Sequence, residues 1–337
     1  MSAVPRTQLP VDGSTVNLSG RDLSGADLAA VDFSGANLTA TDLSGADLTG
    51  ADLSGARLIG AKLNGATMNG ADLTDATLSV ATLMWADLRD AELSSADLVG
   101  ADMTGVDMSG ANLQGRDLIG AKLTDAKLTD AKLDGADLTG AALNGADMTG
   151  AVLTDADLTG ADLSDVELND SELSGCGLVS VDLSGADLTG ATLDGADLSS
   201  ADLSGANLSG VNLSGLNMSR ADMTGIDLFL ADLSGAKLRM ADFTGADLSC
   251  AKLEGAELDG AKLTGTNMSG ANLTGAELDG ADLTGADLDC ADLTGADLSH
   301  ADLSGLDLTT AKLYGAALDG ADVTDTEGLS GARRRGT

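Results

Sequence analysis

Carboxylates are the residues of this chain that could do chemistry, and they recur with strict spacing. The stretch Ser44–Gly55, SGADLTGADLSG, carries an aspartate at every fifth residue. The whole chain has 54 acidic and 18 basic residues, a formal net charge of −36. Paired carboxylates act as general acid and base when their surroundings separate their pKa values. Because nearly identical pairs recur throughout this chain, no single pair is marked as catalytic.

The remaining reactive residue types offer little for catalysis. His300 is the one histidine, and Cys176, Cys250 and Cys290 are too few and too scattered for a disulfide framework or a zinc site. The repeats carry no inserted loop that could build a pocket. Aspartates that face solvent also lack the burial that tunes a catalytic pKa. We therefore expect no enzymatic activity, no catalytic residue, no cofactor and no metal site.

The elements that position these carboxylates follow from the frame A-D-L-S/T-G. From Leu18 to Val323 there are 62 frame positions at residue numbers ending in 3 or 8; all are apolar and 52 are leucine. A period of five would spiral apolar residues around a helix and alternate them across a strand. The chain must therefore turn a corner in each repeat. Leucine and the alanine two residues before it face inward, while aspartate, serine or threonine, and glycine face outward or form the corner.

The unit Ala46-Asp47-Leu48-Thr49-Gly50 resembles the motif of the pentapeptide-repeat proteins at every position, and the resemblance covers about nine-tenths of the chain. It implies an all-β fold, a right-handed quadrilateral parallel β-helix or solenoid with four repeats per coil and about 15 coils. One internal pattern agrees with four sides. Apolar residues replace serine or threonine at separations that are multiples of twenty, which places them on one face: Ile59, Val99, Ile119 and Val179.

Three segments are expected along the chain. Residues 1–15 form an N-terminal cap through Leu9 and Val11, because an open coil end is an edge strand. Residues 16–325 form an uninterrupted pentapeptide-repeat β-helix, and residues 326–337 form a C-terminal cap with a short basic tail. The N-terminal segment has no apolar signal core, and no apolar run approaches the ~20 residues that span a bilayer. These features predict a soluble protein of the cytoplasm.

Four sides divide the aspartate positions into four columns, and two adjacent columns carry most of the negative charge. With coils about 4.8 Å apart, the predicted rod carries about one net negative charge per ~2 Å, against one per ~1.7 Å in duplex DNA. The candidate acidic partner surface consists of Asp22, Asp27, Asp42, Asp47, Asp87, Asp102, Asp107, Asp182, Asp187, Asp222, Asp227, Asp242 and Asp247.

The leading functional hypothesis is a non-enzymatic, acidic, rod-shaped interaction protein. The resemblance implies more, because family members of the quinolone-resistance type bind DNA gyrase as duplex-like acidic rods and some protect it from topoisomerase poisons. We therefore expect a DNA mimic that binds and modulates or protects DNA gyrase or another DNA-binding protein. The same hypothesis predicts no direct binding of nucleic acid or membrane, and it leaves an end-to-end homodimer open. The alternative role of the charge is solubility of a long β structure.

A scaffold for an unidentified protein partner is the second hypothesis. Apolar residues at outward positions are its candidate docking anchors, since aromatic side chains are common binding anchors. These residues are Met84, Trp85, Phe229, Leu230, Ile59, Val99, Ile119 and Val179.

Two basic features interrupt the acidic pattern. Arg116 stands at an inward position that usually holds alanine, and because a buried unpaired charge is costly we expect its head to reach outward toward an aspartate. Lys122, Lys127 and Lys132 fall on three successive sides of about one coil, with acidic residues close by that could neutralise them.

Overall fold

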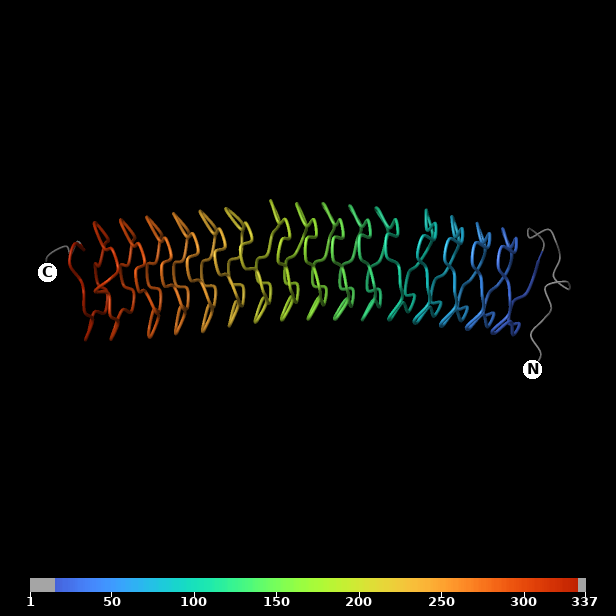
Figure 1. The fold of residues 1–337 in the computed structure, drawn as a ribbon, viewed down its shortest axis with the longest axis horizontal. Helices are drawn as coiled ribbons and strands as arrows, with labels where there is room; N and C mark the ends of the chain where they lie inside the picture. The colour runs from blue at the N-terminus through green and yellow to red at the C-terminus, as the bar shows by residue number, and fades with distance from the viewer. Residues whose placement is uncertain (1–15, 333–337) are drawn as a thin grey trace. The chain divides into compact units, whose positions relative to one another are not determined.

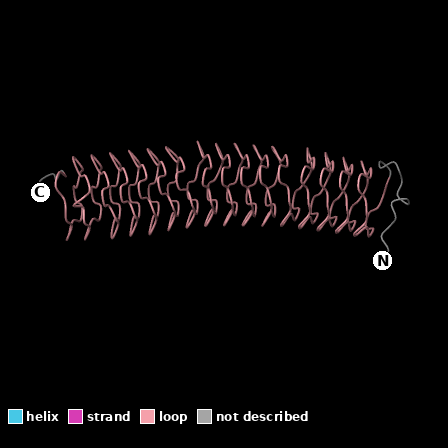
Figure 2. Cartoon of the chain, in the orientation of Figure 1, coloured by secondary structure: helices cyan, strands magenta, loops and turns pink. Residues whose placement is uncertain are grey.

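Single bridge residues joined by turns build the whole described structure. The computed structural model describes residues 16–332, so the expected contacts of Leu9 and Val11 and the tail arginines at 333–335 lie outside the described residues. Within residues 16–332 there is no helix and no strand longer than one residue (Figure 2). Each five-residue repeat supplies one bridge residue at its aspartate position and a two-residue turn at its corner.

The chain divides into two compact units, Met1–Glu172 and Leu173–Thr337. In Figure 1 the described part of the first unit runs from blue to green and that of the second from yellow-green to red. Each unit by itself is a stack of coils in which every repeat forms one side. The domain bounds expected at 15/16 and 325/326 stay a prediction.

The register of each stack is set by parallel pairing between residues twenty apart. In the first unit Asp27 pairs with Asp47, and in the second Asp222 pairs with Asp242. Backbone hydrogen bonds follow the same register: the Leu28 N–H donates to the Asp47 carbonyl at 2.7 Å, and the Asp47 N–H donates to the Ala26 carbonyl at 2.9 Å. Twenty residues are four repeats, so the four-sided β-helical solenoid is confirmed. Its right-handed sense and the number of its coils stay predictions.

The core of each unit is the column of leucines with the alanines beside them. Leu28, Phe33 and Ala46 are fully or almost fully buried, as is Phe243 in the second unit. Burying a leucine side chain stabilises a fold by roughly 1.5–3 kcal/mol, which explains how a chain with few aromatic residues offsets its ordering entropy.

Threonines at inward positions donate their hydroxyls to backbone carbonyls. The buried Thr41 donates to the Leu18 carbonyl at 2.9 Å, and the buried Thr266 donates to the Phe243 carbonyl at 2.7 Å. Each bond reaches back to the preceding coil, so these substitutions add a hydrogen bond between coils instead of leaving an orphan donor.

Corners are formed by one residue in the left-handed region, which is why glycine recurs every fifth residue. Gly50 has φ of 61° and Gly105 has φ of 65°. Non-glycine residues accept the same conformation at other corners, including Trp85 at 60° and Asp125 at 55°. Glycine adopts this region without the steric penalty that a side chain meets.

The pairing continues past the expected repeat boundary. Glu327 pairs with Asp307, and the Gly315 N–H donates to the Gly331 carbonyl at 3.1 Å. Residues 326–331 therefore continue the pairing with the preceding coil. Nowhere between residues 16 and 332 does the chain form a helix that could cross a membrane.

Candidate interaction surface

Each aspartate in the A-D-L-S/T-G frame accepts a hydrogen bond from the turn that follows it. Asp47 Oδ1 accepts the Thr49 N–H at 3.0 Å, and Asp22 Oδ1 accepts both the N–H and the hydroxyl of Ser24 at 3.1 and 2.7 Å. This is the two-residue bond that aspartate and asparagine make in turns. The side chain at this position therefore has a structural role in every repeat where it occurs.

Asparagine performs the same structural role without a charge. Asn37 Oδ1 accepts the Thr39 N–H at 3.2 Å, and Asn207 Oδ1 accepts the Ser209 N–H at 3.1 Å. The same bond is made by Asn17, Asn112, Asn212, Asn217, Asn267 and Asn272. This bond needs a side-chain oxygen but not a negative charge, and the turn itself also forms after Lys62 and Ala142, which have no such oxygen. The predominance of aspartate is thus a property of the surface that the fold does not require.

Hydrogen bonds keep these carboxyl groups ionised. The hydroxyl and N–H of Ser24 hold the pKa of Asp22 below its usual value, and those of Thr49 do the same to Asp47. At Asp102 desolvation raises the pKa, but bonds from Thr104 and the charge of Lys122 outweigh it, so the net pKa is lowered. Asp22, Asp47 and Asp102 consequently keep their negative charge to a pH below the ordinary aspartate range.

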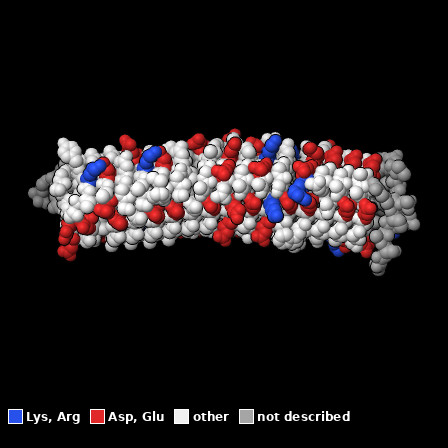
Figure 3. Space-filling model, viewed as in Figure 1, with Lys and Arg blue, Asp and Glu red and all other residues white. Residues whose placement is uncertain are grey.

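The predicted acidic residues align as columns within each unit. Asp22 pairs with Asp42, and on the adjacent side Asp27 pairs with Asp47. In the second unit Asp222 pairs with Asp242 and Asp227 pairs with Asp247. Figure 3 shows the visible face, where red carboxylates recur with uncharged side chains between them. The structure therefore contains the columns, whereas their binding to a partner stays a prediction.

Basic residues in the columns pair with the coil before them. Five lysines contact the aspartate twenty residues earlier, with Nζ–Oδ2 distances of 2.9 to 3.6 Å: Lys62 with Asp42, Lys122 with Asp102, Lys252 with Asp232, Lys262 with Asp242, and Lys312 with Asp292. The lysine side chains are mostly exposed, so each pair contributes little to stability. Their main effect is to neutralise part of the column.

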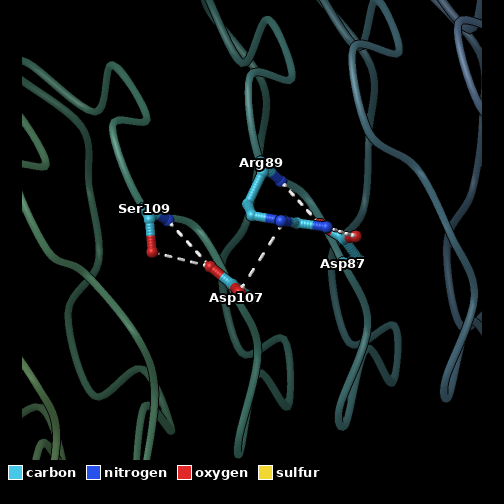
Figure 4. A network of polar contacts seen from close by, with 4 residues as sticks. All are labelled: Asp87, Arg89, Asp107 and Ser109. Atoms are coloured by element: carbon cyan, nitrogen blue, oxygen red, sulfur yellow. Dashed lines mark hydrogen bonds and ion pairs between the residues drawn. The ribbon is translucent and has the colours of Figure 1, made fainter.

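Arg89 neutralises a second position of the candidate surface. Its Nε and Nη2 donate to the Asp87 carboxylate at 2.8 and 2.6 Å, and its Nε lies 3.8 Å from Asp107 Oδ2 (Figure 4). Ser109 donates to the other oxygen of Asp107 through its hydroxyl at 2.7 Å. The guanidinium also lowers the pKa of Asp87, mainly through the side-chain hydrogen bond. Asp87 and Asp107 are therefore less available to a partner than the sequence indicates.

The thirteen predicted acidic residues consequently differ in their electrostatic state. Asp42, Asp87, Asp102, Asp107 and Asp242 have basic partners. Within residues 16–332 no ion pair is found for Asp22, Asp27, Asp47, Asp182, Asp222, Asp227 and Asp247, and Asp187 lies in the same column as Asp227 and Asp247. The sequence could not make this distinction, because it depends on which side chains meet between coils.

The predicted apolar anchors divide into exposed and half-buried residues. Trp85 is 61% exposed, while Phe229 and Leu230 are 43% and 54% exposed. Trp85 lies against the next corner, where a Cβ at Gly105 would overlap its indole ring. Val99 and Ile119 are also exposed, whereas the half-buried anchors are Met84, Ile59 and Val179.

The residues of the proposed apolar stripe are divided between the two units. Ile59, Val99 and Ile119 each begin a corner turn on the same side of the coil in the first unit. Val179 belongs to the second unit. Three further exposed apolar or aromatic residues were not predicted as anchors: Val80, Met240 and Tyr314, which are 61%, 64% and 76% exposed. Val80 and Met240 replace the corner glycine, so an apolar residue at a corner was the available signal.

Arg116 does not meet the expected aspartate. Its Nε donates to the carbonyl of Gln114 at 3.2 Å, and no ion pair to Arg116 occurs among residues 16–332. The side chain is half-buried at the margin of the core. The prediction of an aspartate partner was wrong because the inward start of this side chain directs it along its own corner.

Comparisons with known proteins agree with the repeat pattern. The family model described as pentapeptide repeats matches successive segments that together run from residue 14 to residue 326. No curated protein sequence matches the chain. Among solved structures, HetL from the cyanobacterium Nostoc sp. strain PCC 7120 is 30% identical over 78% of this chain and 90% of its own, with a TM-score of 0.27.

Two further solved structures are similar in sequence pattern. A pentapeptide-repeat protein of the Arabidopsis thaliana thylakoid lumen is 34% identical over 29% of this chain and 68% of its own, with a TM-score of 0.29. QnrB1, a plasmid-mediated fluoroquinolone resistance protein, is 21% identical over 66% of this chain and 89% of its own, with a TM-score of 0.24. The repeat matches, and the turn and core geometry that accompanies them, show that the chain belongs to the pentapeptide-repeat family.

Proposed function

We propose that this protein is a non-enzymatic interaction protein whose acidic columns imitate the phosphate rows of duplex DNA and bind DNA gyrase or another DNA-binding protein. The observation that carries the proposal is that the fold does not require the negative charge of its outward aspartates. Asn37 and Asn207 close the turn as well as Asp47 does, yet most repeats use aspartate.

The geometry of each unit supplies a regular charge spacing. Successive coils in a parallel ladder lie about 4.8 Å apart, so a column carries a carboxylate at roughly that interval wherever the residue is acidic. Phosphates on one DNA strand are separated by ~3.4 Å along the axis, and the second strand doubles the charge. Two adjacent columns would carry one charge per ~2.4 Å if every position were acidic, against one per ~1.7 Å in duplex DNA, and their lysines and uncharged residues lower that density.

The ionisation of the surface supports the same role. The pKa of Asp22, Asp32 and Asp47 is lowered mainly by hydroxyl hydrogen bonds from the residue two positions later. These groups remain charged at neutral pH even beside like charges. Attraction to a basic groove then acts over a distance and weakens as salt screens it.

The experiment is inhibition of gyrase supercoiling by the purified protein across a salt series. We expect inhibition at micromolar concentration that weakens as salt increases, together with protection of gyrase from a quinolone. The test variant carries Asp22→Asn, Asp27→Asn, Asp47→Asn, Asp222→Asn and Asp227→Asn, which preserve the turn oxygen.

A matched control separates the columns from net charge. It carries five corner substitutions, Asp75→Asn, Asp125→Asn, Asp155→Asn, Asp165→Asn and Asp170→Asn, at positions with positive φ that asparagine accepts. Both variants lose five charges. Weaker inhibition by the column variant alone supports the proposal, whereas no inhibition by the folded wild-type protein would refute the gyrase assignment.

A docking scaffold is the second candidate, favoured by the exposure of Trp85 and of the adjacent pair Phe229 and Leu230. A pull-down from native cells with the wild-type protein, Trp85→Ala and Phe229→Ala tests it. Loss of a partner with the apolar variants and retention with the column variant would favour the scaffold. We further propose a cytoplasmic location and leave end-to-end dimerisation to sedimentation measurements.

A further inference from the structure

The backbone ladder of the first unit opens between two successive coils. Before the opening, the Leu88 N–H donates to the Asp107 carbonyl at 2.8 Å, and after it the Met103 N–H donates to the Lys122 carbonyl at 2.9 Å. Around this point, the amides that would continue the ladder and make no inter-coil bond within the described residues include Leu93, Ser95, Leu98, Asn112 and Asp117. Figure 1 shows wider spacing between coils in its teal region. The opening extends over two adjacent sides.

Arg116 lies at the opening. It occupies the inward position that Ala96 and Ala136 occupy in the coils before and after it. Enclosing a guanidinium there without a partner would be costly. Ala96 is 8% exposed, whereas Ala136 on the other side is 1% exposed.

A cleft of about 180 Å³ lies at this opening, and every residue that lines it is polar. Ser94 and Ser95 form the corner of one coil, and Asn112, Gln114 and Arg116 come from the next. The lining thus offers hydroxyl, amide and guanidinium donors, and the Ser95 N–H lacks its ladder acceptor. No carboxylate lines the cleft.

We infer that this cleft binds a small oxyanion, a phosphate or a carboxylate, through Arg116. Only the Nε of Arg116 has a protein acceptor among the described residues, which leaves the two terminal nitrogens as donors. A guanidinium offers parallel N–H groups that match two oxygens of one anion. Ser94 and Ser95 add donors from the opposite coil, so an anion here would connect the two coils on either side of the opening.

The charges around the cleft limit the ligand to a small one. Lys132 follows Asn112 in the same column, and because an asparagine occupies the place where other lysines meet aspartate, Lys132 has no ion pair among residues 16–332. Asp134 does not line the cleft, and it accepts a hydrogen bond from the Gln114 side-chain amide at 2.8 Å. The acids at the frame positions of the two open sides are Glu92, Asp97 and Asp117. They and the net charge of −36 disfavour a nucleic acid or a polyphosphate.

The test is a titration of the isotope-labelled full chain with inorganic phosphate and, separately, with acetate at constant ionic strength. We expect saturable NMR shifts of the Arg116 Nε–H and the Ser95 amide. Arg116→Ala should weaken binding at least about tenfold, because charge-assisted hydrogen bonds are lost. Arg57→Ala, which removes the same charge from an outward position in the same unit, should leave the affinity unchanged.

Folding of the variant is checked by the same spectra. Arg116→Ala installs the residue usual at this position, so the ladder should close and hydrogen exchange at Leu93 and Ser95 should slow. Saturation by phosphate alone supports a phosphate site, and saturation by both anions supports a site that also accepts a partner's carboxylate. Absence of saturation by either anion up to about 50 mM, or equal shifts in Arg116→Ala, would overturn the inference. Neither result depends on gyrase binding.

Discussion

If the fold uses the oxygen of an outward aspartate and not its charge, replacing Asp182 by alanine and by asparagine should change stability differently. Asp182 is half-buried, and its Oδ1 accepts the N–H of Ser184 at 3.0 Å and its hydroxyl at 2.7 Å. Asp182→Ala loses both bonds. Since each contributes a net 0.5–1.5 kcal/mol and water can replace part of the loss, we expect about 1 kcal/mol lower stability. For a unit of this size that corresponds to a decrease of about 2–4 °C in Tm.

Asp182→Asn should behave differently. The amide oxygen keeps both bonds, and removal of the charge relieves repulsion from Asp202, which pairs with Asp182 in the next coil. We expect a Tm equal to or slightly above that of the wild-type protein. Thermal unfolding followed by circular dichroism measures both variants. If Asp182→Asn destabilises as much as Asp182→Ala, the charge itself is required by the fold and the reasoning fails.

Three further predictions concern the pH range, the corners and the core. The pKa values of Asp22 and Asp47 are lowered in the folded chain, so both groups stabilise the fold above the unfolded pKa of 3.8. This stabilisation should be lost as pH falls through the lowered pKa values. Circular dichroism from pH 7 to pH 2 tests this, and greater stability below pH 3 would contradict it. Gly105→Ala should destabilise by about 1–3 kcal/mol more than Gly45→Ala, because only Gly105 faces the Trp85 ring, and chemical denaturation compares them. Thr266→Val should cost about 0.5–1.5 kcal/mol by the same measurement through loss of the bond to the Phe243 carbonyl; an unchanged midpoint would show that this bond adds nothing.

Much of the fold followed from the sequence because the repeat is local and uninterrupted. A five-residue period forces corners, and the apolar positions identify Leu28 and Ala46 as core before any coordinates are known. The columns of aspartate then follow from the twenty-residue coil. Each of these inferences needs only the pattern within one coil.

The features that the sequence did not predict depend on contacts between coils. The pairing of Arg89 with Asp87 and Asp107 requires knowledge of which side chains meet across the ladder. The opening beside Arg116 is a break in the backbone pairing between two particular coils. The division at Glu172 likewise reflects contact density that no single repeat encodes.

The most direct test of the central claim compares the two five-aspartate variants in the gyrase supercoiling assay at low and high salt. Both lose the same charge and both keep their turn oxygens. The account predicts that the column variant loses inhibition at low salt while the corner variant retains it. Equal inhibition by both variants would show that the ordered columns are not what a partner recognises.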